Sequence, residues 1–447
     1  MLKQKPLQYV LFASSLLLYL VMAYGIQRYQ TIPLFICYFS LFYLYIRILL
    51  KHDRIQEKEF NFWMLAAIFF RAGLLFSVPA LSDDFYRFIW DGRLLAAGYH
   101  PFAEVPSFYM TDTFSIPGID AEIFDKLNSK DRFTIYPPVC QFIFWISAVL
   151  SPGSVYGSMV VMKIIIFSFE MATLWIFTKI IRHFNRSVKG VLIYALNPLV
   201  ILELTGNLHF EGIMIFFLLL GIFLLIRMQS LPSVLAYSLS ICTKLIPLLF
   251  LPLMLRSLGW KKAFTYWVLA GLITALLFLP LLNTAIIHGF STSLGYYFQR
   301  FEFNASIYYL IREAGYWIVG FNIIQYAGPA LGLIAAILIV ILSFRNVRAN
   351  QPAGIDKEFV TGMLWSLLLY FLLTTILHPW YIITLLAIGI LTPFRFPIVW
   401  SGMIFLTYAG YTETSFQENL LLVAVEYLTV FGYLLYETAW MKRQKLS

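Results

Sequence analysis

The sequence predicts an all-α polytopic membrane protein, and three observations lead to this fold class. Hydrophobic residues make up 60% of the 447 residues and charged residues only 12%, with a mean hydropathy of +0.78. Apolar runs of about 18 residues or more recur along the chain, and a helix of that length crosses a hydrocarbon core of about 30 Å. The stretches between these runs are too short for a separate soluble domain of ordinary size.

The predicted spans follow one another along the whole chain. The first apolar run comes after Lys3 and Lys5, as in a signal peptide. However, it is longer than a typical signal-peptide core and no small-residue cleavage site follows it, so it is predicted as a span. Similar runs bring the total to about twelve spanning helices in a single domain, 1–447. Their predicted ranges are 9–26, 32–50, 61–81, 159–181, 190–205, 210–227, 264–282, 323–344, 359–377, 379–394, 397–411 and 420–440.

Two further apolar segments are predicted to enter the membrane without crossing it. Segment 136–151 is short and opens with two prolines, and segment 234–256 is interrupted by Lys244 and Pro247. With both treated as re-entrant or juxtamembrane helices, most Lys and Arg fall in loops on one side of the membrane, together with both termini. Because basic loops stay in the cytoplasm, this side is predicted as cytoplasmic and the long loop 82–158 as non-cytoplasmic.

Charge and cysteine content argue against several other classes. The net charge is +9, but the Lys and Arg residues are spread over short loops without a patch, so nucleic acid is not a predicted partner. Cys37, Cys140 and Cys242 have unrelated spacings, which indicate neither a metal site nor a disulfide framework. No G-x-G-x-x-G motif follows a predicted strand, so a nucleotide-sugar domain of the Rossmann type is not expected.

Charge is concentrated in the block "SDDFYRFIWDGRLLAAGYHPF", residues 82–102, which begins the long loop. Asp83 and Asp84 stand where the third predicted span ends. Carboxylates at a membrane boundary can bind a divalent metal, act as a general base, or simply end a helix in solvent. The residues that follow decide which of these readings is favoured.

Those residues suit a phosphorylated sugar. Arg87 and Arg93 have the planar guanidinium that makes bidentate contacts with phosphate oxygens. Tyr86 and Trp90 supply aromatic surface of the kind that stacks on sugar rings. An aspartate beside phosphate-binding arginines at a membrane surface favours sugar transfer from a lipid-linked phosphosugar.

The same block resembles the first-loop signature of membrane glycosyltransferases of the GT-C class. It is most similar to that of bacterial polyprenol-phosphate-mannose-dependent mannosyltransferases and their relatives among the GPI mannosyltransferases. Their motif reads approximately S-D-D-x-Y-R-Y-x-W-D-G-R-x-x-x-x-G-x-N-P-[FY], and this chain departs from it at Phe88 and His100, where Tyr and Asn are usual. Further blocks resemble the family in the expected order, so the resemblance covers residues 80–382: "YPP" at 136–138, "YALNPLVILELTGNLHFEG" at 194–212, "KLIPLLFLP" at 244–252 and "HPWY" at 378–381.

The resemblance implies a GT-C-like fold, with spanning helices around a cavity that the first catalytic loop, 82–158, caps with juxtamembrane helices. It implies transfer of a hexose, most simply mannose, from a polyprenyl-phosphate sugar to a glycan or lipid-linked acceptor, with inversion at the anomeric carbon. The site would face the periplasm or exterior of a bacterial inner membrane, and the lipid bilayer would be the protein's environment.

The resemblance also implies roles for individual residues. Asp83 or Asp84 would be the catalytic base, and the motif leaves open which of the two acts. Positive side chains would stabilise charge on the leaving phosphate. The candidates for that role are Arg87, Arg93 and Lys244, the last because a charge inside an apolar stretch is costly unless it lines a cavity.

A second acidic position is expected in the turn "ELTGNLHFEG", where Glu211 or His209 best matches it. His378 of "HPWY" is a further candidate for contact with the sugar or phosphate, beside Tyr86 and Trp90 in the first loop. A divalent metal, Mg²⁺ or Mn²⁺, is an open alternative, with Asp83, Asp84 and Glu211 as its possible ligands.

Two rival functions remain at this point. A transporter or flippase for a lipid-linked or phosphorylated substrate would use the aspartates as ion sites, but it should carry polar residues through both leaflets, whereas the candidates here gather at one side. A polymerase or ligase with a diphosphate-linked donor usually has its long arginine-rich loop late in the chain. Here the long loop is early and begins with acidic residues.

Overall fold

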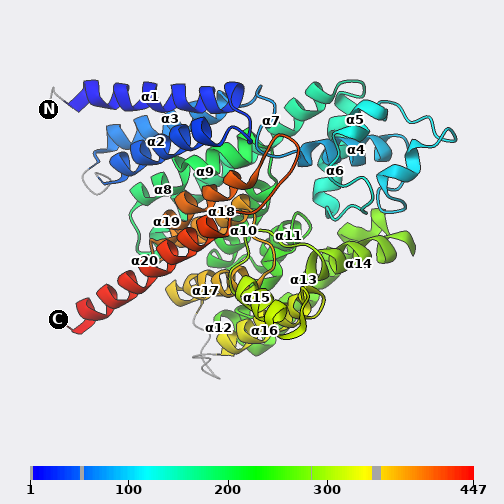
Figure 1. Ribbon diagram of the computed structural model, residues 1–447. Coiled ribbons are helices and arrows are strands. Elements are labelled where there is room, and N and C mark those ends of the chain that lie inside the picture. Colours follow the sequence, from blue (N-terminus) through cyan, green and yellow to red (C-terminus); the bar gives the residue numbers. More distant parts are fainter. Residues whose placement is uncertain (1–3, 51–54, 283, 345–353, 447) are drawn as a thin grey trace. The chain divides into compact units, whose positions relative to one another are not determined.

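The computed structural model describes residues 4–50, 55–282, 284–344 and 354–446, and within these ranges helices are the only extended regular elements (Figure 1). Two isolated β-bridges join Phe303 to Ile376 and Tyr411 to Phe416. The predicted all-α class is therefore confirmed. The chain forms two compact units, unit 1 (1–81, 171–209 and 378–447) and unit 2 (82–170 and 210–377). The single domain 1–447 stays a prediction.

Unit 1 contains the helices at both ends of the chain. Several large apolar side chains on α1 and α2 are exposed, among them Leu17 and Ile36, as expected of helices that face lipid. The helices of unit 1 are α1 (Gln4–Gly25), α2 (Thr31–Leu49), α3 (Glu57–Ala72), the second part of α7 (Val155–Ile180), η3 (Ile181–Phe184), η4 (Val188–Val191), α8 (Leu192–Ala195), α9 (Pro198–Val200), η5 (Ile201–Gly206), η8 (Pro379–Tyr381), α18 (Ile382–Gly389), α19 (Phe396–Met403), η9 (Ile404–Gly410) and α20 (Leu420–Leu446).

Unit 2 contains the long loop and the middle of the chain. Its helices are α4 (Asp84–Ala96), η2 (Pro106–Met110), α5 (Ala121–Asp125), α6 (Pro138–Leu150), the first part of α7, α10 (Glu211–Ile226), α11 (Ser230–Ile241), η6 (Ile246–Phe250), α12 (Met254–Leu258), α13 (Trp260–Phe278), η7 (Leu279–Leu281), α14 (Thr284–Gln299), α15 (Ile307–Val319), α16 (Ile324–Phe344) and α17 (Lys357–Leu373).

The part of the chain that the structure describes has six helices long and apolar enough to cross a membrane, or seven if one bent pair counts as a span. A polytopic membrane protein is thus confirmed, while the count of about twelve spans is not. Several other predicted spans form shorter apolar helices, such as Glu211–Ile226 and Phe396–Gly410. The six are Pro6–Gly25, Thr31–Leu49, Val155–Phe184, Trp260–Leu281, Ile324–Phe344 and Leu420–Gln444.

The bent pair breaks at an asparagine followed by a proline. Proline suits the first position of a helix because its missing N–H needs no partner there. Asn197 caps the new helix, with its Oδ1 accepting from the N–H groups of Leu199 at 3.0 Å and Val200 at 3.4 Å. The two halves, Val188–Ala195 and Pro198–Gly206, are bent by 54° at this point. The second half ends in η5, a π-helical turn.

The two segments predicted not to cross the membrane are short or broken in the structure. The 136–151 segment forms α6, which starts at the second of its two prolines. The 234–256 segment is interrupted after α11 ends at Ile241, and regular structure resumes only at Ile246. The two segments meet, because the N–H of Val139 donates to the carbonyl of Cys242 at 3.0 Å.

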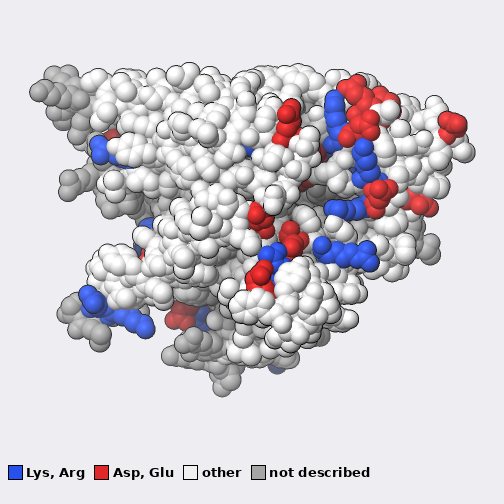
Figure 2. All heavy atoms as spheres, viewed as in Figure 1, with Lys and Arg blue, Asp and Glu red and all other residues white. Residues whose placement is uncertain are grey.

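The long loop is folded and anchored within unit 2. His100 Nδ1 accepts from the N–H of Phe102 at 3.3 Å, so the protonated Nε2 donates to the carbonyl of Leu281 at 2.9 Å. Ser293 Oγ of α14 donates to the carbonyl of Phe133 at 2.9 Å. The histidine that replaces the usual asparagine of the motif is therefore an anchor. On the face shown in Figure 2, charged side chains of both signs gather over the helices of this loop.

Candidate active site

The functional residues of the first block lie on α4, which is short and almost entirely buried. Asp84 stands in its first turn and Arg93 in its last, which matches the helix macrodipole at both ends. Gly92 lets α4 approach α6 closely. A Cβ at this position would lie 2.3 Å from the carbonyl oxygen of Phe144, so the tight packing of the two helices requires glycine here.

Asp83 and Asp84 are both half-buried at the start of α4. Asp84 Oδ1 accepts a hydrogen bond from Asn128 Nδ2 at 2.8 Å, and the N–H of Asp84 donates to Ser82 Oγ at 3.3 Å. The loop that follows α5 therefore orients the Asp84 carboxylate.

Asp83 and Asp84 affect the pKa values of different tyrosines. Burial first, and then the negative charge of Asp84, hold the pKa of Tyr136 and that of Tyr297 above the ordinary value. Burial also raises the pKa of Tyr86, and there Asp83 adds to the rise while Lys126 opposes it. These phenols stay protonated at neutral pH and can donate hydrogen bonds. Asp84 thus contributes to the raised pKa of Tyr136 and of Tyr297, and Asp83 to that of Tyr86.

Arg87 belongs to a buried polar network that holds the loop in place. Its Nε donates to Asp91 Oδ1 at 2.8 Å, and its Nη1 donates to the carbonyl of Arg132 at 2.8 Å. The fully buried Asp91 also accepts from Thr134 Oγ1, and from Gln141 Nε2 at 3.0 Å. Asp91 is therefore a structural partner of Arg87. Because the buried Asp91 accepts from three donors, it holds α4, α6 and the loop in this arrangement.

Lys244 and Glu211 form an ion pair within unit 2. The antiparallel helices α10 and α11 bring the first residue of α10 beside the break that follows α11, where Lys244 lies. The side chain of Glu211 is almost completely buried, whereas that of Lys244 is 24% exposed. Lys244 is therefore the more accessible member of the pair.

An aromatic cluster connects this ion pair to α4. Phe88 of α4 stacks on Phe144 of α6 with ring centroids 4.8 Å apart, and meets Phe210 edge-to-face at 5.3 Å. Phe210 directly precedes Glu211 in the chain. Of the ten predicted site residues, the structure places all but His209 and His378 in unit 2.

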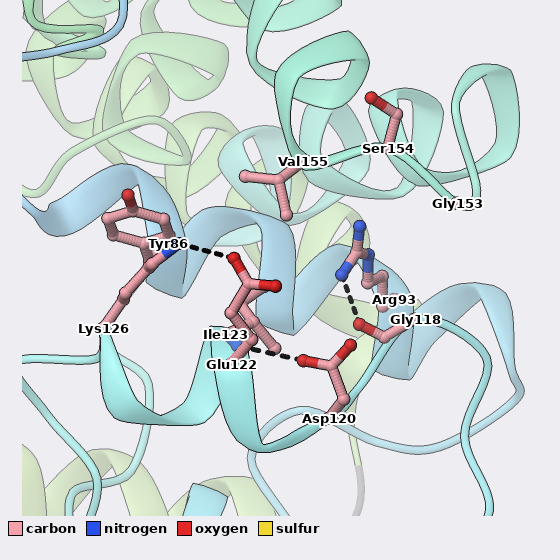
Figure 3. A pocket seen from close by; sticks show the side chains of 10 residues that line it. All are labelled: Tyr86, Arg93, Gly118, Asp120, Glu122, Ile123, Lys126, Gly153, Ser154 and Val155. Atoms are coloured by element: carbon pink, nitrogen blue, oxygen red, sulfur yellow. Dashed lines mark hydrogen bonds and ion pairs between the residues drawn. The ribbon is translucent and has the colours of Figure 1, made fainter.

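A cavity of about 300 Å³ opens beside α4 in unit 2. Figure 3 shows its side chains, which come from α4, from α5 and the residues on either side of it, and from the start of α7. Two residues predicted as substrate contacts, Tyr86 and Arg93, line it together. The other lining residues are Gly118, Asp120, Glu122, Ile123, Lys126, Gly153, Ser154 and Val155.

Arg93 is the most deeply placed charge of this cavity, with 4% of its surface exposed. Its Nη1 donates to the carbonyl of Gly118, and its buried Nε has no hydrogen-bond partner. Burial lowers the pKa of Arg93, and the charge of Asp120 opposes this. Gly118 has a φ of 77°, and a Cβ there would lie 2.9 Å from Arg93 Cζ, so glycine is needed for this contact.

The two predicted aromatic contacts differ in their surroundings. Tyr86 faces the cavity, with Lys126 Nζ 5.6 Å from its ring centroid. Trp90 is completely buried and its ring centroid lies 6.0 Å from that of Phe124 in α5. Trp90 therefore packs against α5 and is absent from the residues that line the cavity. Direct contact of Trp90 with a sugar stays a prediction.

In unit 1, the structure brings together the two predicted histidines. The indole of Trp380 stacks on His209 with ring centroids 3.8 Å apart, and on His378 at 4.5 Å. His209 Nε2 lies 3.2 Å from Oε2 of Glu203, whose Oε1 accepts a hydrogen bond from the hydroxyl of Tyr408 at 2.6 Å. The blocks "ELTGNLHFEG" and "HPWY" thus form one cluster, although 170 or so residues of chain separate them.

The described residues show no grouped ligands for a divalent metal. Among the described residues, no three His, Cys, Asp or Glu side chains are grouped so that they could hold a metal ion. Asp83, Asp84 and Glu211 accordingly do not form a ready ligand set in this conformation.

Several residues of the site were not predicted from the sequence. The cavity residues Asp120, Glu122 and Lys126 lie in a stretch with no recognisable motif, and only the turn signal Pro-Gly at 117–118 marks it. Glu203 is buried in a π-helical turn, a feature often found at functional sites. Glu203 opens the block "ELTGNLHFEG", within which the prediction favoured Glu211 or His209.

Comparison with known proteins adds two findings. Residues 11–259, more than half of the chain, match the family described as alpha-(1->6)-mannopyranosyltransferase, N-terminal domain. The chain is also similar to Alpha-(1->6)-mannopyranosyltransferase A of Mycobacterium tuberculosis (strain ATCC 25618 / H37Rv), with 23% identity over 332 residues that cover 69% of this chain and 61% of the relative. The chain thus spans less than two thirds of that relative's length. By its match over α1 to α12, this membrane protein belongs to the alpha-(1->6)-mannopyranosyltransferase family.

Proposed function

We propose that the protein transfers a mannosyl unit from a polyprenyl-phosphate sugar to a hydroxyl of a glycan or lipid-linked acceptor. The observation that carries this proposal is the pair of half-buried carboxylates, Asp83 and Asp84, at the start of α4. They lie in the block that resembles the catalytic first loop, within the residues that match the family. The name of the relative points to an α-(1→6) linkage in the product.

The reaction is a single displacement. One of the two carboxylates accepts the proton of the acceptor hydroxyl while its oxygen attacks the anomeric carbon. The new glycosidic bond forms as the bond between that carbon and the phosphate oxygen breaks, and polyprenyl phosphate leaves with the electron pair. Inversion of a β-linked donor then gives the α-linked product. A placed base contributes about 10²–10⁴-fold to such a rate.

The charge that develops on the leaving phosphate requires a cation nearby. Of the three predicted cations, we assign this task first to Lys244, whose side chain is the most exposed and lies at a break in an apolar stretch. Arg87 holds the loop through the carbonyls of Ser129 and Arg132. Arg87 therefore supports the site by fixing α4, and Arg93 faces the cavity.

The remaining predicted contacts are assigned to the sugar and the acceptor. Glu211 would orient Lys244 through their ion pair. His209 and His378 both stack on Trp380 and would bind hydroxyl or phosphate oxygens. We place the catalytic loop on the periplasmic face of a bacterial inner membrane and both termini in the cytoplasm, which the distribution of Lys and Arg supports.

Separate Asp83→Asn and Asp84→Asn variants test this proposal. Membranes that contain each variant are supplied with polyprenyl-phosphate mannose and an α-(1→6)-linked mannose oligosaccharide, and the transfer rate is measured at matched expression. Loss of the base should lower the rate by about 10²–10⁴-fold, and the other variant should lose less. The exposed loop residue Asp112, changed to Asn, is the control. Full transfer activity in both variants would sink the assignment.

A further inference from the structure

The cavity beside α4 is built to bind something other than an anion. Its wall carries two cations, Arg93 and Lys126, and two carboxylates, Asp120 and Glu122. Lys126 Nζ is 2.7 Å from Glu122 Oε1, so one charge of each sign is already paired at the rim. An incoming phosphate would meet Asp120 and Glu122 as like charges, which weakens the attraction of Arg93.

A hydroxyl-rich neutral ligand matches both signs. Each hydroxyl donates one hydrogen bond and accepts others. It can donate to the carboxylates of Asp120 and Glu122 and accept from the guanidinium of Arg93. Burial leaves Arg93 Nε without a partner in the described structure, and a buried unsatisfied donor costs about 1–3 kcal/mol. A ligand oxygen in the cavity can relieve part of this cost.

The remaining wall suits the apolar face of a sugar ring. Tyr86 and Val155 line the cavity beside the buried side chain of Ile123 (Figure 3). A hexose has C–H groups on one face and hydroxyls at its edge, and aromatic rings with a polar tip serve such amphipathic ligands. The volume of about 300 Å³ is at the lower end of the range for small-molecule sites, which limits the occupant to about one hexose unit.

We propose that this cavity binds one neutral hexose unit of the acceptor glycan and so holds the glycan on the catalytic loop. The assignment to the acceptor rests on the proposed function, whereas the binding of a hexose does not. In this arrangement Arg93 meets a hydroxyl, and the donor's phosphate is left to Lys244. The sugar enters as a binding unit and undergoes no reaction in the cavity.

The test uses the full chain purified in detergent, with α-(1→6)-mannobiose as the probe and its binding followed by calorimetry. Gly153 lines the cavity, and a Cβ added to it meets no atom within 4 Å, so a larger side chain fits the backbone there. Gly153→Phe fills the cavity and should weaken mannobiose binding at least tenfold. Ala97→Phe, at an exposed position of the same loop, is the matched control and should bind as the wild type does.

A second variant removes charge without filling space. Asp120 caps α5 by accepting from the N–H of Ile123 at 3.0 Å, and Asn is an equally good cap. Asp120→Asn should therefore keep the fold and weaken mannobiose binding several-fold, whereas Asp112→Asn should not. In transfer assays, both cavity variants should raise the KM for the acceptor more than they lower kcat.

Two results would overturn the inference. One is unchanged mannobiose affinity in both cavity variants. The other is displacement of bound mannobiose by inorganic phosphate at concentrations below those of the sugar, which would make the cavity an anion site. Binding by the Asp83→Asn and Asp84→Asn proteins separates the two proposals. If Gly153→Phe still weakens mannobiose binding when it is added to the Asp83→Asn or Asp84→Asn protein, the cavity binds sugar whatever reaction the protein catalyses.

Discussion

At the scale of single residues, the candidate site depends on completely buried groups that hold its segments together. Asp91 is the clearest case, because it accepts from Arg87, Thr134 and Gln141 and so joins three chain segments. The motif "WDGR" reads as a row of catalytic candidates, yet its Trp90 and Asp91 are completely buried. The motif therefore specifies the packing of α4 as much as the chemistry at the start of that helix.

Gly92 offers a test of this structural part of the motif. Gly92→Ala places a methyl group 2.3 Å from the carbonyl oxygen of Phe144, so α4 and α6 must separate. Overpacking of this kind costs about 1–3 kcal/mol, and the temperature at which the purified protein unfolds in detergent should fall. Gly153→Ala, where the added Cβ meets nothing, should leave that temperature unchanged. Equal unfolding temperatures for the two variants would contradict the close approach of α4 to α6.

At the scale of elements, the breaks in helices position the polar residues. The π-helical turn η5 ends at Gly206, and Asn207 follows it directly. Asn207 Oδ1 accepts from the N–H of Leu81 at 3.0 Å, and its Nδ2 donates to the carbonyl of Leu202 at 3.0 Å. The turn thereby fixes the backbone two residues before Asp83.

Asn207→Ala should loosen that backbone. The N–H of Leu81 loses a hydrogen bond worth about 0.5–1.5 kcal/mol, which corresponds to faster amide exchange by about two- to tenfold. Hydrogen-exchange mass spectrometry of the peptide that contains Leu81 measures the change. Asn61→Ala, at an exposed position of α3, is the control and should leave the exchange of that peptide as it is. If Asn207→Ala also leaves the exchange rate of the Leu81 peptide unchanged, Asn207 does not hold this segment.

The same breaks explain how far the sequence could predict the fold. Helices at 32–50 and 323–344 were predicted almost to the residue, because a continuous apolar run in lipid must satisfy its backbone internally. The run 61–81 is also apolar, but its helix ends at Ala72. Hydropathy reports the cost of transfer to lipid and does not report that a turn, which begins at Gly73, ends the helix.

Some residues of the candidate site could be predicted from the sequence and others could not. Asp83, Asp84 and Arg93 could be predicted because they lie in one continuous motif. Asp120 and Ser154 could not, since they reach the cavity only through the fold of the loop between α4 and α7. The pair of His209 and Trp380 likewise depends on a contact between distant segments of unit 1. A single sequence does not specify such contacts.

At the scale of the whole molecule, α7 fixes the topology more firmly than the count of basic loops does. The apolar helix Val155–Phe184 has 30 residues, enough to span the hydrocarbon core. Its two ends must then lie on opposite sides of the membrane, however many other helices cross. The long loop precedes α7, and a basic stretch that includes Arg182 and Lys189 follows from its last turn onward.

Labelling with a membrane-impermeant thiol reagent tests this arrangement. Cysteine is introduced at Asp112 in the long loop or at His183 after α7, both exposed, in a variant whose partly exposed Cys37 is serine. In intact bacterial cells with a permeabilised outer membrane, Asp112→Cys should react and His183→Cys should not, because positive loops stay in the cytoplasm. Both should react once the inner membrane is opened. Reaction of both in intact cells would mean that α7 does not span the membrane. Reaction of His183→Cys alone would place the long loop in the cytoplasm and so contradict the proposed periplasmic site.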